Sequence, residues 1–438
     1  MEKKSNLYAM DFIDAEHLKV MQLERLKRIV AHAYNNVEFY RNRMKKYNLK
    51  PESIRSLDDV VKLPFMVKQD LRDTYPFGLL AVPQSEVVRL HASSGTTGKP
   101  IVVAYTREDL KVWTEVVHRA FANCGLSNAD IVQVSYGYGL FTGGLGAHYG
   151  AEDLGATVVP TSGGNTRRQI MLMRDFGVNA ICCTPSYFIH LIDEAAKSGI
   201  DLKELPIRAG IFGAEPWTAG MRKYVEQNAG IEAFDIYGLS EIIGPGVAIE
   251  CPCHCGLHLY EDHFYPEIIN PDTGEVLPDG ETGELVLTTL SKYAMPMIRY
   301  RTRDLTRIIP GRCACGRTIR RIDRISSRSD DMFIIRGVNV FPSQIEAALL
   351  SVPGTTPNYQ ITLYTERGMD NVAIEVELSQ EKCSELGDNQ EGFRRQVAAM
   401  VESVTGIRMS LELKAPNTLP KSEGKAKRVI DRRDLNAI

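Results

Sequence analysis

The residues SSGTTGKP, at positions 93–100, bring hydroxyl groups, glycines and one lysine into a single short loop. A loop that binds a triphosphate needs glycines, because backbone N–H groups must approach phosphate oxygens closely, and it gains from hydroxyl donors and a lysine. The flanking segments VVRLHAS and IVVAYT have the composition of strands, which predicts a phosphate-binding hairpin. Pro100 follows Lys99 where a Walker A loop needs Ser or Thr, so the loop is of another kind. A polar turn without a ligand is the alternative interpretation, and the length of the run favours the triphosphate.

Five of the nine cysteines lie in two short stretches, CPCHCGLH at 251–258 and CAC at 313–315. Clustered cysteines and histidines are typical of structural zinc sites, in which four ligands close a tetrahedron and leave no position for a substrate. We predict a structural Zn²⁺ ion that cross-links and stabilises the β structure between residues 251 and 315. Its preferred ligands are Cys251, His258, Cys313 and Cys315, while spacing leaves Cys253, His254 and Cys255 open as substitutes. Reduced thiols without a metal are the alternative interpretation.

The stretch SYGYGLFTGGLGAHYG, at 135–150, mixes aromatic residues with glycines. Tyr136, Tyr138 and Phe141 offer aromatic walls, and glycines such as Gly143 leave space for a flat ring. This composition suits the binding of an aryl acid. Aromatic core packing beside a glycine-rich turn is the alternative interpretation.

Periodic patterns predict the elements that position these residues. Residues 16–47 have the apolar spacing of an amphipathic helix or helix pair, and strand-like and helix-like segments alternate from about residue 107 to EAFDIYGLSE at 232–241. Such alternation is typical of a largely parallel sheet covered on both faces by helices. Beyond residue 257, the turn signals PDTG, PDG and TG predict antiparallel β structure.

We therefore expect an α/β protein with two domains. Residues 1–329 would form a large N-terminal domain of mixed sheets flanked by helices, plus a β region, and residues 330–438 a small mobile α+β domain joined to it at Asp330. The net charge of -3 argues against a nucleic-acid partner, and no apolar run approaches the roughly 20 residues that cross a bilayer. The N-terminus lacks the apolar core of a signal peptide, so we expect a cytoplasmic protein. The sequence does not fix the oligomeric state, and a homodimer is allowed.

Further motifs follow one another along the chain: HASSGTTGKP, GAEP, DIYGLSE, EDHFYPEI, GELVLTTL, YRTRDLT, RSDDMFIIRGVNVFP and GKAKRVID. In these motifs and their order, over nearly its full length, the chain resembles the adenylate-forming acyl-CoA synthetase superfamily, and within it the phenylacetate-coenzyme A ligase family. The resemblance implies an enzyme that joins a small aryl acid to AMP with ATP and Mg²⁺, and then transfers the acyl group to coenzyme A. Zinc would be an addition in this chain, because the chemistry does not require it.

The resemblance also implies roles for individual residues. Tyr237 is similar to the family's adenine-stacking aromatic residue, Glu241 to its Mg²⁺-binding carboxylate, and Asp304 to the acceptor of hydrogen bonds from the ribose hydroxyls. Together with the stretch 135–150, this gives the expected substrate-binding residues Tyr136, Tyr138, Phe141, Gly143, Gly213 and Tyr237. The implied nucleotide-binding residues are Ser93, Ser94, Gly95, Thr96, Thr97, Gly98, Lys99, Gly213, Ala214, Glu215, Pro216, Asp235, Ile236, Tyr237, Gly238, Ser240, Asp304 and Arg328.

The predicted small domain carries the remaining implied roles. Lys425, in SEGK, resembles the lysine that enters the active site during adenylation, with Lys427 as the nearby alternative, so we take Lys425, Glu241 and Thr96 as the catalytic residues. Arg336 and Gly337, in RGVNVFP, are the candidates for coenzyme A binding after the domain turns about Asp330. The family usually has glycine before the arginine that corresponds to Arg328, and Ser327 replaces it here.

The implied function is that of an ATP-dependent phenylacetate-coenzyme A ligase. Three other interpretations stay open: a ligase for another aryl acid such as indoleacetate or benzoate, an adenylyltransferase that acts on a different acceptor, and a nucleotide-binding sensor without catalysis. The presence of Lys425 and Glu241 argues against the sensor.

Overall fold

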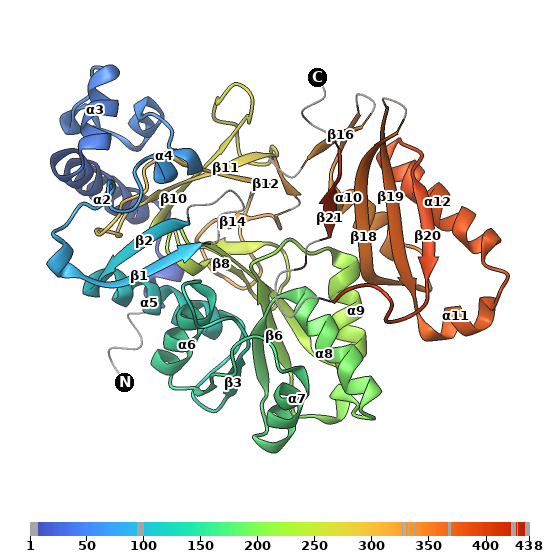
Figure 1. Cartoon of the computed structure of the whole chain (residues 1–438). Coiled ribbons are helices and arrows are strands. Elements are labelled where there is room, and N and C mark those ends of the chain that lie inside the picture. Colours follow the sequence, from blue (N-terminus) through green and yellow to red (C-terminus); the bar gives the residue numbers. More distant parts are fainter. Residues whose placement is uncertain are drawn as a thin grey trace.

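The computed structural model describes residues 8–93, 100–325, 327–329, 332–335, 338–366, 369–421, 426 and 428–433. Figure 1 shows a large body that contains the long central sheet and, beside it, a smaller body built from the C-terminal residues, coloured orange to red. Among the described residues, no helix is both long enough and apolar enough to cross a membrane.

The N-terminal part of the large body is helical. Asp14 caps the first long helix, because its Oδ1 atom accepts hydrogen bonds from the backbone N–H groups of Glu16 and His17, each at 3.1 Å. Leu26, Ile29 and other apolar side chains on one face of this helix are buried, as an amphipathic pattern predicts. The helices of this part are α2 (Ala15–Asn36), α3 (Glu38–Lys46) and α4 (Lys68–Asp73).

The central sheet changes from parallel to antiparallel pairing at β7. Within the described residues it has nine strands in the order β13-β14-β9-β8-β7-β6-β5-β3-β4, and β3 to β7 pair in parallel. Successive residues of β5 enter different hydrophobic clusters, Ala180 and Cys182 on one face and Ile181 and Cys183 on the other. The predicted parallel sheet with two covered faces is therefore confirmed. Its parallel strands are β3 (Ile131–Val134), β4 (Thr157–Val159), β5 (Ala180–Cys183), β6 (Ala209–Gly213) and β7 (Glu232–Leu239), and the helices around them are α5 (Arg107–Asn123), α6 (Gly143–Leu154), α7 (Thr166–Asp175), α8 (Pro185–Lys197) and α9 (Ala219–Ala229).

Antiparallel strands complete the large body. The central sheet continues through β8 (Gly244–Glu250), β9 (Leu257–Leu259), β14 (Arg321–Ile322) and β13 (Ile308–Ile309). A second antiparallel sheet is formed by β10 (Phe264–Ile269), β11 (Gly283–Thr289), β12 (Tyr300–Thr306) and β15 (Ser327–Arg328). The strands β1 (Val87–Ser93) and β2 (Ile101–Thr106) pair as an antiparallel hairpin on either side of the glycine-rich loop. Residues 94–99 of that loop lie outside the described residues.

The smaller body has its own hydrophobic core, which includes Ile335, Ile345, Leu349, Ile361 and Val376. A separate core is the property that defines an independently packed unit, and it places β16 and all later elements together. These elements are β16 (Phe333–Ile335), β17 (Val338–Val340), α10 (Pro342–Leu350), β18 (Thr355–Glu366), β19 (Met369–Leu378), α11 (Gln380–Leu386), α12 (Glu391–Thr405), β20 (Ser410–Lys414) and β21 (Val429–Asp431). Figure 1 shows the smaller body next to α8 and α9 of the large one.

Candidate active site

A cavity of about 450 Å³ lies where the central sheet, the second sheet and α4 meet. Ligand sites are commonly concave, with apolar walls and a few polar groups, and this cavity combines aromatic rings with carboxylates and basic side chains. Many residues with predicted roles share its lining: Ser93, Tyr136, Phe141, Gly143, Ala214, Glu215, Pro216, Asp235, Ile236, Tyr237, Gly238, Ser240, Glu241, Asp304 and Arg328. The cavity thus gathers residues that are up to 261 positions apart in the sequence, from Val67 to Arg328.

Strand β7 supplies one side of the cavity. It lies between the parallel strand β6 and the antiparallel strand β8, so hydrogen bonds on both edges fix its register. The backbone N–H of Asp235 donates to Glu250 Oε2 on β8 at 2.9 Å, and Arg324 Nε lies 3.6 Å from Asp235 Oδ2. Burial and the nearby Glu250 carboxylate raise the pKa of Asp235.

Tyr237, Asp304 and Arg328 form a polar strip across the neighbouring sheet. The Tyr237 hydroxyl donates to Asp304 Oδ2 at 2.6 Å, and Arg328 Nε lies 3.6 Å from Asp304 Oδ1. Asp304 on β12 is the register partner of Arg328 on β15, which explains how two residues 24 positions apart meet here. Burial and the Asp304 carboxylate raise the pKa of Tyr237, so its hydroxyl remains a donor at neutral pH. The strip offers an aromatic face beside a fixed carboxylate.

Glu241 places a buried carboxylate at the cavity wall, just after β7. Its Oε1 atom lies 3.5 Å from Lys68 Nζ and 3.4 Å from the hydroxyl of Tyr300. The backbone carbonyl of Glu241 accepts a hydrogen bond from Lys292 Nζ at 2.9 Å. Because Lys292 is 1% exposed, burial lowers its pKa to about 8. Contacts to its side chain and to its backbone thus hold Glu241 in place. Its carboxylate offers oxygen atoms of the kind that Mg²⁺ prefers as ligands.

The glycine-rich aromatic stretch divides between the cavity and the interior. The Tyr136 ring lines the cavity and is held in place because its hydroxyl donates to the Cys183 carbonyl at 2.8 Å. Phe141 also lines the cavity and is 41% exposed, so its ring is free to adjust. Gly143 lies directly against both rings, since a Cβ atom there would lie 2.7 Å from Phe141 Cε1 and 3.2 Å from Tyr136 Cγ.

Two residues with predicted substrate contacts are placed elsewhere. The hydroxyl of Tyr138 lies 3.2 Å from His148 Nδ1 on α6, and Tyr138 is not among the described residues that line the cavity. Gly213 ends β6, where a Cβ atom would lie 2.3 Å from the Ile236 carbonyl oxygen. The glycine is therefore needed for the close approach of β6 to β7. Like Tyr138, Gly213 is not among the described residues that line the cavity.

Some predicted site residues lie outside the described residues: Ser94, Gly95, Thr96, Thr97, Gly98, Lys99, Arg336, Gly337 and Lys425. The hairpin that carries the first six of them does reach the cavity, because Ser93 at the end of β1 lines it.

Three basic residues of this site were missed by sequence reasoning. Lys68 and Arg72 on α4 line the cavity, and Lys292 lies beneath Glu241. The segment MVKQDLRD carries no motif and has the ordinary composition of a helix start, and Lys292 lies in a turn after β11. Only tertiary packing brings Lys68 and Lys292 to Glu241, so no local signal could have identified them.

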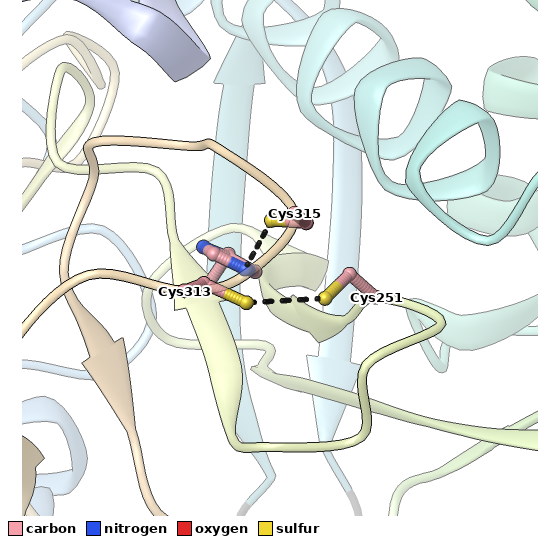
Figure 2. A group of neighbouring side chains, drawn as sticks. Cys251, Cys313 and Cys315 are labelled. Atoms are coloured by element: carbon pink, nitrogen blue, oxygen red, sulfur yellow. Dashed lines mark hydrogen bonds between the residues drawn. The ribbon is translucent and has the colours of Figure 1, made fainter.

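The predicted zinc ligands form a separate cluster at the far end of the central sheet from β4. Figure 2 shows Cys251, Cys313 and Cys315 close together, with Cys251 and Cys313 joined by a dashed line at an Sγ–Sγ distance of 3.6 Å. Cys315 Sγ lies 3.4 Å from His258 Nε2, and the four ligand atoms all lie within 4.8 Å of one another. Ligand atoms bound tetrahedrally to one zinc at its usual bond lengths lie about 3.5–3.8 Å apart. The donor set of the four preferred residues therefore suits zinc in its chemistry, and two of its contacts, at 3.6 and 3.4 Å, lie close to this spacing.

The possible substitutes are placed less favourably for a metal. The ring nitrogens of His254 face Glu232 Oε1 at 3.0 Å and Arg222 Nη1 at 2.7 Å. Cys253 is exposed. Cys255 Sγ does lie 3.4 Å from Cys313 Sγ, but it also accepts from Arg321 Nη1 at 2.9 Å. Burial lowers the pKa of His258 to about 4, so its imidazole is neutral at pH 7, as a metal ligand must be.

Comparison with known families and proteins agrees with this geometry. The family described as AMP-binding enzyme matches residues 27–291, and the AMP-binding enzyme C-terminal domain matches residues 337–433. Phenylacetate-coenzyme A ligase of Pseudomonas putida is 53% identical over 426 residues, which cover 97% of this chain and 96% of that protein. Phenylacetate-coenzyme A ligase of Escherichia coli strain K12 is 48% identical over 437 residues, which cover 99% of each chain.

A solved 2-hydroxyisobutyryl-CoA ligase, 29–30% identical in sequence, matches differently in two of its states. In the postadenylation state, bound to an acyl-AMP, it gives a TM-score of 0.91 over 96% of this chain and 91% of its own. In the thioesterification state, bound to an acyl-AMP and CoA, it gives 0.71 over 97% of this chain and 92% of its own. Both comparisons use the same ligase and nearly the same share of this chain, so the difference in TM-score reflects how the two bodies are arranged. The arrangement in this chain is closer to that of the postadenylation state than to that of the thioesterification state.

Proposed function

The chain belongs to the phenylacetate-coenzyme A ligase family of AMP-binding enzymes, and from this premise we propose that it activates phenylacetate with ATP and transfers the phenylacetyl group to coenzyme A. The observation that carries the proposal is one cavity lined by aromatic rings and by the carboxylates Glu241 and Asp304. An aryl acid and a nucleotide can lie side by side there, which is what adenylation needs.

The first step joins the acid to AMP. A carboxylate oxygen of phenylacetate attacks the α-phosphorus of ATP, a new O–P bond forms, and the bond to the bridging oxygen breaks so that pyrophosphate leaves. We assign the adenine to the face of Tyr237 and the ribose hydroxyls to Asp304, whose carboxylate is already fixed by the Tyr237 hydroxyl and Arg328. The ring of the acid would lie against Tyr136 and Phe141.

Positive charge must balance the phosphates during this step. Lys68 and Arg72 on α4 line the cavity, and Lys68 already lies 3.5 Å from Glu241. From the family motif we assign Lys425, which the structure does not describe, to the α-phosphate and the attacking carboxylate, and Thr96 and Lys99 to the other phosphates. Glu241 would hold Mg²⁺, which spreads the charge that develops on the leaving pyrophosphate.

The second step transfers the acyl group. The sulfur of coenzyme A attacks the acyl carbonyl carbon, a C–S bond forms, and the C–O bond to AMP breaks so that AMP leaves with the electron pair. The thiol proton is released to solvent as the thioester forms. We assign the approach of coenzyme A to the smaller body, at Arg336 and Gly337, after that body turns about Asp330, and these three residues lie outside the described part of the chain.

We also propose that Cys251, His258, Cys313 and Cys315 hold a structural Zn²⁺. The support is the spacing of the four ligand atoms and the position of the cluster, where it joins the loop after β8 to the loop between β13 and β14. Four protein ligands would close the coordination sphere, so this metal would stabilise the fold without taking part in the reaction.

Incubation of the purified protein with ATP, Mg²⁺ and phenylacetate tests the first step, and addition of coenzyme A tests the second. We expect phenylacetyl-AMP and pyrophosphate in the first mixture, and phenylacetyl-CoA and AMP in the second, all identified by mass spectrometry. Indoleacetate and benzoate in parallel reactions rank the acids. Adenylate formation without any thioester would refute coenzyme A as the acceptor, and a higher kcat/KM with another acid would refute phenylacetate as the preferred substrate.

A further inference from the structure

Lys292 is a buried basic residue to which the proposed reaction steps give no role. It lies in the turn after β11 and is 1% exposed, and the described lining of the cavity does not include it. Burial of an ammonium group costs stability unless nearby groups compensate for it, and a methionine could pack in the same place without this cost. A side chain that served only to fill space would therefore not need the charge.

The Lys292 ammonium connects the turn that carries Glu241 to the hairpin of β1 and β2. Its Nζ atom donates a hydrogen bond to the Glu241 carbonyl oxygen at 2.9 Å, and it lies 5.0 Å from the centre of the Tyr105 ring on β2. The Tyr105 hydroxyl donates to the Ile243 carbonyl at 3.0 Å, in the same turn as Glu241. The turn expected to bind Mg²⁺ and the hairpin expected to bind the triphosphate are thus held together by one buried cation and the ring beneath it.

Asp109, in the first turn of α5, fixes the segment that carries Lys292. Its carboxylate accepts hydrogen bonds from the backbone N–H groups of Tyr293 at 2.6 Å and Ala294 at 3.0 Å, the two residues that follow Lys292. It also accepts one at 2.8 Å from the N–H of Thr106, at the end of β2. Lys292 therefore approaches Glu241 from a backbone that is itself attached to the hairpin.

The position of the Glu241 carboxylate depends on its backbone. The contacts of its Oε1 atom to Lys68 Nζ and to the Tyr300 hydroxyl measure 3.5 and 3.4 Å, longer than ordinary hydrogen bonds. The bond from Lys292 to the Glu241 carbonyl, at 2.9 Å, has the ordinary length. The contact that holds Glu241 most closely is therefore one to its backbone, made by a residue outside the cavity.

We propose that Lys292 is a positioning residue for metal binding, which acts through the Glu241 carbonyl to hold the Glu241 carboxylate where Mg²⁺ and ATP meet it. The proposal rests on the proposed function, which assigns Mg²⁺ to Glu241. Removal of a group that orients a metal ligand without touching the metal commonly lowers metal affinity by about 10–100-fold. Loss of Lys292 should therefore weaken metal binding and leave the acid site as it is.

The test measures metal binding directly in Lys292→Met, which removes the donor and the charge but keeps an unbranched apolar side chain. Mn²⁺, a spectroscopic substitute for Mg²⁺, is titrated by electron paramagnetic resonance into protein with a saturating non-hydrolysable ATP analogue. We expect the dissociation constant for Mn²⁺ to rise about tenfold or more, and KM for phenylacetate at saturating Mg²⁺ to stay within about twofold of the wild-type value. An unchanged dissociation constant would overturn the proposal.

The wild-type protein separates this proposal from the proposed function. If it forms phenylacetyl-AMP from phenylacetate, ATP and Mg²⁺, the ligase function stands, and an unchanged Mn²⁺ affinity in Lys292→Met overturns the role of Lys292 alone. If the wild-type protein forms no phenylacetyl-AMP, it is the proposed function that fails.

A double variant shows whether Lys292 acts through Glu241. In a Glu241→Ala background, Lys292→Met should cause no further loss of Mn²⁺ affinity, because the carboxylate that the lysine positions is absent. An equal loss in both backgrounds would overturn the proposal. Lys292→Leu is the second variant should Lys292→Met fail to fold, and the same loss of Mn²⁺ affinity is expected from it.

Tyr40→Phe is the matched control. Tyr40 is also buried, and its hydroxyl donates to the Pro296 carbonyl at 2.6 Å, in the same connection between β11 and β12 that carries Lys292. That carbonyl belongs to a residue with no proposed role in the reaction. We expect the wild-type dissociation constant for Mn²⁺ in this variant. A rise equal to that in Lys292→Met would show that any lost hydrogen bond to this connection weakens the metal, and would overturn the specific role of Lys292.

Discussion

Replacement of Gly143 by alanine tests whether Tyr136 and Phe141 form the wall of the acid site. A new methyl group would lie 2.7 Å from Phe141 Cε1 and 3.2 Å from Tyr136 Cγ, both closer than side-chain atoms normally pack. Tyr136 cannot move aside, because its hydroxyl is bound to the Cys183 carbonyl at 2.8 Å. The partly exposed Phe141 ring must shift instead, and since it lines the cavity, the shift changes the space offered to the acid.

The expected magnitude follows from the size of the change. One methylene in an apolar substrate pocket is worth about 1–3 kcal/mol of discrimination, so kcat/KM for phenylacetate should fall at least about tenfold in Gly143→Ala. KM for ATP should stay within about twofold, because Tyr237 and Asp304 lie on strands that the change does not touch. The assay is steady-state pyrophosphate release, measured first at varied phenylacetate with saturating ATP and then at varied ATP with saturating phenylacetate.

Gly139→Ala is the matched control for this prediction. It lies in the same glycine-rich stretch, but a Cβ atom there would meet no described atom within 4 Å. Wild-type kcat/KM is therefore expected in the control. Equal losses in both variants, or a loss for ATP as large as that for phenylacetate in Gly143→Ala, would refute the assignment of this wall to the acid.

Three further predictions concern basic and metal-binding residues. Lys68→Ala should raise KM for ATP about tenfold, because a cation near the phosphates is lost. The urea midpoint should change little, because the Lys68 side chain is 38% exposed. An unchanged KM for ATP would contradict the role given to α4. Burial lowers the pKa of Lys292 from 10.5 to about 8, so the unfolded chain binds more protons between these pH values and the folded protein gains stability as pH rises through them. Relative to Lys292→Met, the wild type should gain about 3 kcal/mol of unfolding free energy between pH 8 and 10.5, at 1.36 kcal/mol per pKa unit, and a difference in urea stability that does not change with pH would contradict this. Cys313→Ser should lose bound zinc, measured by elemental analysis, and lower the thermal midpoint, whereas Cys253→Ser should retain both; equal zinc content in the two variants would contradict the ligand set.

The parallel sheet and the hairpin around the phosphate loop could be predicted from sequence, because both depend on local signals. The alternation of apolar strands with helices leaves few other folds, and VVRLHAS and IVVAYT do pair as β1 and β2. The continuation of the same sheet by β8, β9, β14 and β13 could not be predicted. Those strands are short and come from distant segments, so only their packing decides which sheet they join.

The candidate site was predictable where motifs carry it and not where packing does. Tyr237 and Asp304 belong to ordered motifs, and the structure places their side chains 2.6 Å apart. Tyr138 lies two residues from Tyr136, yet its hydroxyl faces His148, because the stretch turns before it enters α6. Lys292 could not be found from sequence, since its importance depends on a single hydrogen bond to a carbonyl 51 positions away.

The change of pairing direction at β7 has a consequence for how enzymes on this scaffold can diverge. Asp235, Ile236 and Tyr237 lie on β7, which pairs in parallel with β6 on one edge and antiparallel with β8 on the other. A substitution that shifts one of these neighbouring strands therefore leaves the other to preserve the register of β7. Tyr136 and Phe141 belong instead to the connection between β3 and α6, which is not itself part of a strand. On the proposed assignment of these residues, mutations in that connection would change which acid is accepted while the nucleotide is still bound as before. Selection for a new substrate would then act on a short stretch of chain, and the ability to form an adenylate would be inherited unchanged.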